Sequence, residues 1–505
     1  MELDIFASLL RGFEVAVTPQ NLLYCFFGVF IGTLIGVLPG IGPVAAIAML
    51  LPATFNLPPV AALIMLAGIY YGSQYGGSTT AILVKLPGES ASVVTCIDGF
   101  EMARQGRAGP ALAVAALASF FAGTVGTILI AVAGPPLAEV ALKFGAAEYF
   151  SLMVLGLIAS AALAHGSLLK AFGMILLGLL LGIVGTDVNS GMARFTFGVS
   201  GLSDGIGFVV VAMGIFGLAE IISNLQQGGG QRDLLSQKIR HLWPSADDFK
   251  RSWKAVMRGT GLGAFFGILP GAGPTIAAFS TYALEKKLAK EPDRFGRGAV
   301  EGVAGPEAAN NGAAQCAFIP TLTLGIPGSA TMALMLGALT IQGIAPGPQV
   351  MTQRPDLFWG LIASMWIGNL FLVILNLPLI GLWVKLLTVP YRRLFPAIMM
   401  FMAIGVYSLN NASLDIWLTV LFGVLGYVFI KLKCEPAPLI LAFVLGPLME
   451  ENLRRALLIS RGDPMVFIER PISAGFLVAT VVIVLLMVMP ALRSRRDRAL
   501  QEAAA

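Results

Sequence analysis

Long apolar stretches interrupted by Pro-Gly corners constrain this chain more than any other feature. Runs such as Asn21–Phe55, Ala108–Ala133 and Leu357–Leu382 exceed the roughly 20 residues that a helix needs to cross a bilayer. Only 12% of the residues are charged, against about 25% in soluble domains, and the mean hydropathy is +0.83. This composition excludes a soluble enzyme, a disordered chain and a nucleic-acid-binding domain. It predicts an all-α integral membrane protein with about ten to twelve crossings.

The chain repeats itself. Gly32–Pro43 reads GTLIGVLPGIGP and Gly263–Pro274 reads GAFFGILPGAGP, with seven of twelve positions identical at an offset of 231. Lys85–Ser90 (KLPGES) similarly parallels Gly325–Ala330 (GIPGSA) at an offset of 240. Two matches in the same order favour an internal duplication over chance similarity of glycine-rich segments.

The duplication divides the chain into three parts. Residues 1–223 form the first membrane repeat, 224–258 a polar linker, and 259–505 the second repeat with an extra C-terminal helix and a basic tail. Basic residues gather in the linker and the tail, so the positive-inside rule places both in the cytoplasm. The acidic N-terminus favours the outside. An odd number of crossings per half then predicts two inverted repeats, the plan of many secondary transporters.

The Pro-Gly corners predict interrupted helices. Proline removes a backbone donor and glycine permits positive φ, so a helix cannot run through Leu38–Gly40 or Ile326–Gly328. The basic loop Glu285–Arg297 favours a re-entrant hairpin for Gly259–Leu284, with arms of about eleven residues, each too short to cross. One broken helix is the alternative.

Interrupted helices expose backbone N–H groups that attract anions and carbonyl groups that attract cations. Hydroxyl and amide side chains concentrate beside the corners, so the corners are predicted to line a cavity for substrate between the two repeats. The predicted substrate-binding residues are Pro39, Gly40, Gly42, Ser78, Thr79, Thr80, Pro87, Gly88, Ser90, Gly271, Gly273, Asn310, Asn311, Pro327, Gly328 and Ser329.

Ionisable residues are costly at membrane depth, which makes them functional candidates. The candidates beside the corners are Lys85, Glu89, Asp98, Glu301 and Glu307. The candidate residues for a coupling ion are Glu307, Asn310, Asn311 and Thr323. For Asp187 and Arg194, a structural ion pair and a role in transport are both open.

The sequence offers no motif for other chemistry. Two histidines and four cysteines without a CxxC pair predict no metal site. There is no phosphate-binding loop and no catalytic motif, so neither ATP hydrolysis nor enzyme activity is expected. No cofactor is expected beyond a coupling sodium ion or proton.

Long motifs resemble the large membrane subunit of the tripartite tricarboxylate transporter family. They are Gly36–Pro43, Tyr70–Thr80, Leu86–Ser90, Asp98-Gly99, Gly185–Gly198, Gly267–Pro274, Glu301–Asn311 and Leu324–Ser329. The resemblance covers nearly the whole chain.

The resemblance implies a multi-pass protein of the bacterial inner membrane. It implies the permease subunit of a binding-protein-dependent secondary transporter, which imports organic di- or tricarboxylates on a sodium or proton gradient. The implied partners are a small membrane subunit and a periplasmic solute-binding protein. The residues alone leave an alternative, a passive channel or structural membrane component.

Overall fold

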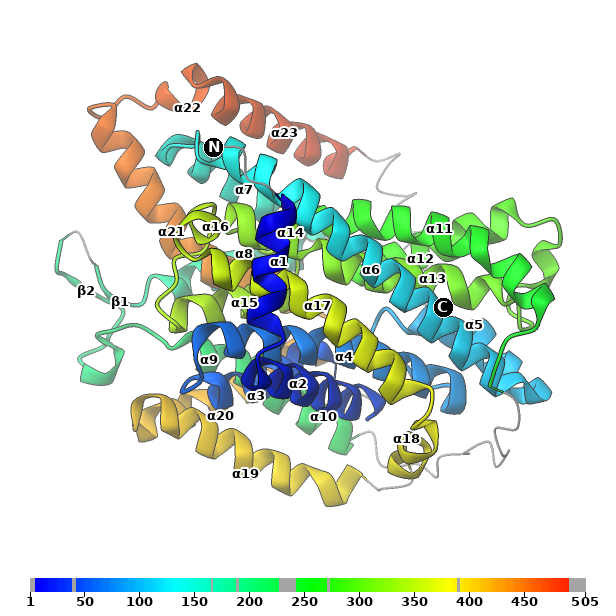
Figure 1. Cartoon of the computed structure of the whole chain (residues 1–505). Helices are drawn as coiled ribbons and strands as arrows, with labels where there is room; N and C mark the ends of the chain where they lie inside the picture. The colour runs from blue at the N-terminus through cyan, green and yellow to red at the C-terminus, as the bar shows by residue number, and fades with distance from the viewer. Residues whose placement is uncertain are drawn as a thin grey trace.

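A computed structural model describes residues 5–38, 42–164, 167–187, 190–226, 242–269, 273–387 and 391–489. Within these ranges the chain is almost wholly helical, and its one small sheet pairs β1 with β2 antiparallel, Gly185 opposite Arg194. The all-α fold predicted from the sequence is confirmed (Figure 1).

The elements of the first half, up to residue 226, are α1 Ile5–Ala16, α2 Pro19–Val37, α3 Pro43–Leu50, η1 Leu51–Thr54, α4 Pro59–Val84, α5 Val93–Met102, η2 Ala103–Arg107, α6 Ala108–Ala141, α7 Ala146–Leu163, α8 Leu168–Gly182, β1 Gly185–Thr186, β2 Ala193–Arg194, η3 Ser200–Leu202, α9 Phe208–Ala212, η4 Met213–Leu218 and α10 Ala219–Gln226.

The elements that follow are α11 Ala246–Ile268, α12 Gly273–Leu288, η5 Pro292–Arg294, α13 Glu301–Cys316, α14 Phe318–Leu324, α15 Ala330–Ile341, α16 Gln349–Gln353, α17 Pro355–Asn376, α18 Ile380–Leu387, α19 Tyr391–Asn410, α20 Ser413–Lys431, α21 Ala437–Ile459, α22 Val466–Glu469 and α23 Pro471–Val488. The helix α11 begins within the predicted linker, while much of the linker and the basic tail lie outside the described residues.

Several helices have the length and composition of membrane spans. Five described helical segments qualify: Pro19–Val37, Ala108–Ala141, Phe208–Gln226, Pro355–Asn376 and Ser413–Lys431. Shorter apolar helices accompany them, among them Leu168–Gly182 and Ala330–Ile341. The chain is a multi-pass membrane protein. Its number of crossings, like the inverted relation of its halves, stays a prediction.

Glycine stripes hold two helix pairs in close contact. The pairs are α2 against α4 and α11 against α13. The glycines whose added Cβ would collide with the backbone of the partner helix are Gly28, Gly32 and Gly36 in α2, and Gly259, Gly263 and Gly267 in α11. Glycines four residues apart let membrane helices approach at backbone distance. The two stripes lie 231 positions apart, the offset of the first sequence match.

The second corner is a hairpin rather than one broken helix. The helices α11 and α12 contact each other, and the Arg258 guanidinium binds the Glu285 carboxylate through two contacts of 2.6 and 2.5 Å. Arg258 lies ten residues before the end of α11, and Glu285 twelve residues after the start of α12. The chain therefore turns back between them. The prediction of arms of about eleven residues was wrong, because α11 has 23 residues and α12 has 16. The tip, residues 270–272, lies outside the described residues.

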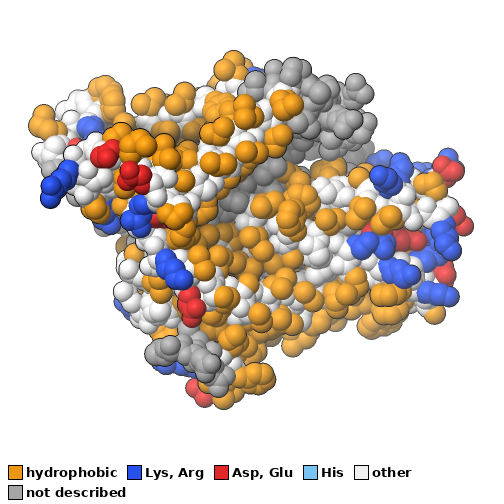
Figure 2. Space-filling view, turned by 90° about the horizontal axis from the view of Figure 1, so that it is seen from above, with side chains coloured by type: hydrophobic (Ala, Val, Ile, Leu, Met, Phe, Trp, Pro, Cys, Tyr) orange, Lys and Arg blue, Asp and Glu red, His pale blue; other side chains and the backbone are white. Residues whose placement is uncertain are grey.

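Surface chemistry matches a membrane protein. Figure 2 shows a broad hydrophobic surface across the middle of the molecule and a dense group of charged side chains at its right-hand end. The β1–β2 hairpin projects at the opposite, left-hand end in Figure 1. The dense group of charged side chains is thus gathered away from the broad hydrophobic surface.

Candidate functional site

A cavity of about 480 Å³ lies between the two halves of the chain. Its lining combines the segments around both predicted corners with the start of α21. The residues from these segments are Gly42, Pro43, Val44, Pro87, Gly88, Glu89, Ser90, Val93, Gly273, Pro274, Thr275, Ile276, Ser329, Ala330, Thr331, Glu435, Pro436 and Ala437. The tertiary structure thus brings together residues that lie up to 399 positions apart in the sequence, from Gly42 to Leu441.

Besides α21, four helices that follow the predicted corners begin at this cavity. They are α3, α5, α12 and α15, which start at Pro43, Val93, Gly273 and Ala330. A helix N-terminus exposes unpaired N–H groups and about half a positive charge, so it attracts anions. These helix ends therefore attract an anion, although the lining includes no arginine, lysine or histidine among the described residues.

Two hydroxyls join the halves at the cavity wall. Ser90 Oγ and Thr275 Oγ1 lie 2.8 Å apart, one after the first LPG motif and the other in the first turn of α12. Ser329 also lines the cavity, and its hydroxyl accepts a hydrogen bond of 3.3 Å from the Met332 N–H at the start of α15. These hydroxyls are available to donate to a carboxylate without the cost of a buried charge.

Acidic and amide side chains form one side of the cavity. The Asn310 amide donates to a Glu89 carboxylate oxygen at 2.9 Å, and Gln74 lies beside the same carboxylate. Glu220 of α10 and Glu435 before α21 also line the cavity. No sequence motif marks Glu220 or Glu435 as a site residue, and the only signal for either is an acidic residue at the edge of an apolar run.

Glu307 lies at a second, separate site. Its carboxylate accepts hydrogen bonds from Ser78 at 2.7 Å, from Ser119 at 3.4 Å and from Thr95. Asn311 donates to Ser119 at 2.7 Å and so extends the cluster. The adjoining cavity measures only about 10 Å³, no more than one water molecule requires. Glu307 is 1% exposed, which makes this a fully buried carboxylate among neutral donors.

The other predicted substrate-binding and coupling-ion residues that the structure describes do not line the larger cavity. Thr79 lines the small cavity near Glu307, whereas the Thr80 hydroxyl donates to Val37 and the Thr323 hydroxyl to Ile319, at 2.8 and 2.7 Å. Pro327 and Gly328 are buried behind the cavity lining. Pro39, Gly40 and Gly271 lie outside the described residues.

The left-handed residues at the LPG and IPG corners differ from those expected. Gly88 and Gly328 do not have positive φ; instead Lys85 has φ 55° and Gly325 has φ 70°. Each of these residues follows the last turn of a helix, α4 or α14, where a left-handed residue satisfies the final carbonyls. The helices thus end before the proline rather than at the Pro-Gly pair.

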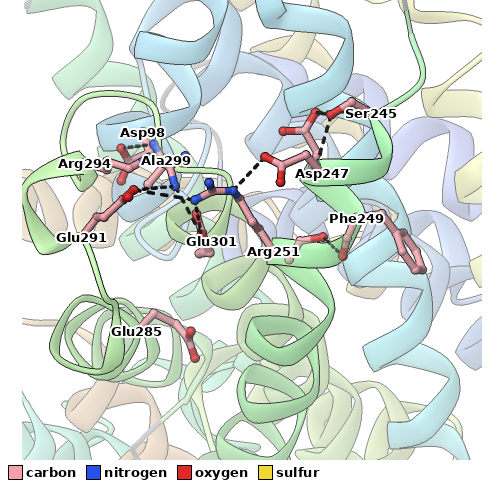
Figure 3. A network of polar contacts seen from close by, with 12 residues as sticks. Asp98, Ser245, Asp247, Phe249, Arg251, Glu285, Glu291, Arg294, Ala299 and Glu301 are labelled. Carbon is pink, nitrogen blue, oxygen red and sulfur yellow. Dashed lines mark hydrogen bonds and ion pairs between the residues drawn. The ribbon is translucent and has the colours of Figure 1, made fainter.

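Asp98 and Glu301 belong to a structural cluster at the charged end of the molecule (Figure 3). The Asp98 carboxylate accepts hydrogen bonds of 2.8–2.9 Å from the backbone N–H groups of Gly296, Gly298 and Ala299. Glu301 lies 3.9 Å from Arg251 and 3.7 Å from Arg294. These contacts fix the loop before α13, so neither acid lies at the cavity.

Asp187 and Arg194 take part in an ion-pair network with α21. Arg194 lies 3.9 Å from Asp187 and 2.8 Å from Glu450, and Arg454 contacts the same two acids at 3.0 and 2.6 Å. The network ties the β1–β2 hairpin to α21. Of the two readings left open by the sequence, the geometry favours a structural ion pair.

Comparisons with known proteins place the chain in a family. A sequence model of the tripartite tricarboxylate transporter TctA family matches residues 22–441. An uncharacterised 52.8 kDa protein in the TAR-I ttuC' 3' region of Agrobacterium vitis is 60% identical over 500 residues, 99% of each chain. An uncharacterised protein in the TAR-II ttuC' 3' region is 60% identical over 240 residues, 48% of this chain and 99% of its own length.

No solved structure matches the chain. The family match extends over most of the sequence and includes all the corners that line the cavity. The chain belongs to the tripartite tricarboxylate transporter TctA family.

Proposed function

We propose that this chain is the permease subunit of a binding-protein-dependent secondary transporter that imports organic di- or tricarboxylates. Membership of the family makes it a component of a tripartite tricarboxylate transporter. The proposal adds the transport path, the driving sodium or proton gradient, and a bacterial inner membrane with the linker and C-terminus in the cytoplasm.

The observation that supports this proposal most is the convergence of four helix N-termini on one cavity. A substrate with two or three carboxylates needs several anion-binding points at once. Helix N-termini from α3, α5, α12 and α15 supply them from different directions. Ser90, Thr275 and Ser329 add hydroxyl donors at the same wall.

The size of the cavity also fits a small substrate. Its volume of about 480 Å³ lies within the roughly 300–1,000 Å³ typical of small-molecule sites. Broken helices around a cavity near the repeat interface are the usual arrangement of secondary transporters. In this proposal, movement of one half against the other opens the cavity to each side in turn.

Glu307 is the proposed carrier of a coupling proton. Its hydroxyl cluster joins α4, α5 and α6 to α13, so a change in its charge acts on both halves. A small adjoining cavity leaves no room for a hydrated ion. Asn311 belongs to the same cluster through its hydrogen bond to Ser119. Thr323, the remaining candidate, donates its hydroxyl to Ile319 of its own helix.

Uptake by proteoliposomes tests the proposal. The purified complex should accumulate labelled carboxylates saturably when a sodium or proton gradient is imposed, and should show no accumulation without one. Linear, non-saturating flux would identify a passive channel instead.

Dependence on the binding protein is tested separately in cells. Deletion of the cognate binding protein should abolish uptake at micromolar substrate, because the partner raises the local substrate concentration and favours one state through differential affinity. Undiminished uptake at low concentration by this chain alone would contradict the three-component reading.

A further inference from the structure

The partial positive charge of the helix N-termini only partly offsets the carboxylates in the cavity lining. Three carboxylates, Glu89, Glu220 and Glu435, line the cavity, and its described lining includes no basic side chain. A polycarboxylate entering this space meets acidic groups of its own sign. A bound cation on the acidic side would remove that conflict.

Unpaired oxygens gather around one of these carboxylates. Gln74 Oε1, Asn310 Oδ1 and the Tyr70 hydroxyl make no hydrogen bond of full geometry among the described residues, although Tyr70 lies close to Gln74 and Ser329. All three side chains are 1% exposed. Buried polar groups are nearly always paired, so three unpaired oxygens at one place indicate a ligand that the protein is built to receive.

The side chains that carry these oxygens lie around Glu89. Asn310 donates its amide nitrogen to the Glu89 carboxylate at 2.9 Å, which fixes the amide beside the carboxylate. Gln74 lies against the same carboxylate. Both Gln74 and Tyr70 line the cavity, and the two side chains are neighbours. The four side chains come from α4, the corner after it, and α13.

We propose that a sodium ion binds between Glu89, Gln74 and Asn310, with the Tyr70 oxygen beside it. Carboxylate, amide and hydroxyl oxygens are the ligands of hard cations. One carboxylate within this set balances one positive charge. No group of three acidic, histidine or cysteine residues capable of holding a metal occurs in the described part of the chain, which argues against a multivalent ion.

The bound sodium ion places a positive charge next to the hydroxyl and N–H donors that are proposed to bind the substrate carboxylates. Glu89 directly precedes Ser90 and follows Gly88, so sodium at Glu89 lies beside the predicted substrate position. This inference rests on the proposed function. It assigns sodium to Glu89 at the cavity, whereas Glu307, whose carboxylate already accepts three hydroxyl hydrogen bonds, is the proposed proton carrier.

Direct binding of sodium tests the inference. Purified full-length chain in detergent is titrated with radioactive sodium, and its Tm is measured in sodium chloride against choline chloride at equal ionic strength. A ligand that binds only the native state raises Tm, so sodium should raise Tm saturably. Glu89→Gln should weaken sodium binding more than about tenfold, and Gln74→Ala and Asn310→Ala should also weaken it.

Asp415→Asn is the matched control. Asp415 is a buried carboxylate that also accepts from an asparagine amide, Asn410 at 2.8 Å, but it does not line the cavity. This variant should bind sodium as the parent chain does. Size-exclusion chromatography of each variant shows whether it is folded.

Two results would overturn the sodium site: sodium binding by folded Glu89→Gln equal to that of the parent chain, or no sodium-specific effect on the parent. The results that would reject the sodium site differ from those that would reject the proposed transport function. Carboxylate uptake driven by protons and indifferent to sodium would reject the sodium site alone. Sodium binding lost in Glu89→Gln without any carboxylate uptake would support the site and reject the transport function.

Discussion

The Ser78 hydroxyl lies 2.7 Å from a carboxylate oxygen of Glu307, a residue 229 positions later in the chain. Both are buried, at 4% and 1% exposure. The contact joins α4 to α13, two helices that are buried along nearly their whole described length. A change of charge at Glu307 is therefore felt by both halves of the protein.

Glu307→Gln should abolish ion-coupled uptake, because the amide keeps the volume but cannot exchange a proton. Ser78→Ala should reduce uptake by about ten- to hundredfold, since a hydrogen bond to a charged group contributes about 1.5–3 kcal/mol. Initial uptake rates in proteoliposomes measure both effects. Thr127→Val is the control, because this buried hydroxyl bonds only to Gly123 of its own helix at 2.8 Å. Normal coupled uptake by Glu307→Gln would remove Glu307 from the mechanism.

The two corner glycines should differ in their tolerance of alanine. A Cβ at Gly88 would collide with the Gly36 carbonyl and the Gly77 backbone, whereas one at Gly328 would lie 3.4 Å from the Gly267 carbonyl oxygen. Gly88→Ala should therefore impair both uptake and thermal stability, and Gly328→Ala should have a much smaller effect. Uptake rates and Tm in detergent compare them. Equal effects of the two substitutions would contradict this packing argument.

A disulfide across the cavity should stop transport. The hydroxyls of Ser90 and Thr275 are 2.8 Å apart, so cysteines at both positions should oxidise in a background without Cys25, Cys96, Cys316 and Cys434. Oxidation should block uptake if the halves must separate there, and a reducing agent should restore it. Each single cysteine variant is the control. Full uptake by the oxidised double variant would show that this contact does not open.

Labelling from outside the cell tests the orientation. A cysteine at Phe197, which is 85% exposed beyond the β1–β2 hairpin, should react with an impermeant maleimide in intact cells. A cysteine at Ser236 in the linker should react only after permeabilisation. The span Phe208–Gln226 separates the two positions. Reaction at Ser236 in intact cells would reverse the predicted topology.

Acid should destabilise the start of α11. Burial alone would raise the pKa of Asp248, but hydrogen bonds from Arg107 and Ser245 outweigh it and lower that pKa. A lowered pKa in the folded state adds stability above the unfolded pKa of about 3.9 and loses it as the pH falls further.

Asp248→Asn should therefore lower the free energy of unfolding at pH 7 by about 1–2 kcal/mol, because hydrogen bonds to a charged group contribute about 1.5–3 kcal/mol and the amide retains part of them. The difference from the parent chain should shrink below about pH 4 in Tm measurements. Asp247→Asn, an exposed neighbour paired with Arg251, should have little effect. A Tm deficit that persists unchanged at low pH would rule out this ionic contribution.

The sequence by itself determined the membrane class, the interruptions at the corners and the resemblance that the family match confirms. These follow from hydropathy and from proline and glycine, which act on the backbone within a few residues. The reversal of the chain between α11 and α12 could be predicted for the same reason, but the 23-residue length of α11 could not. The contact between Arg258 and Glu285 then showed that the chain turns back.

Only the tertiary structure decided which polar groups meet. Glu89 and Asn310 lie 221 positions apart, and neither Glu220 nor Glu435 has a motif that assigns it to the cavity. Membrane helices are apolar on most sides, so their sequences contain little periodicity to show which face meets which neighbour. That choice comes from long-range packing, here from glycine stripes that fix α2 on α4 and α11 on α13 and so place the helix N-termini around one space.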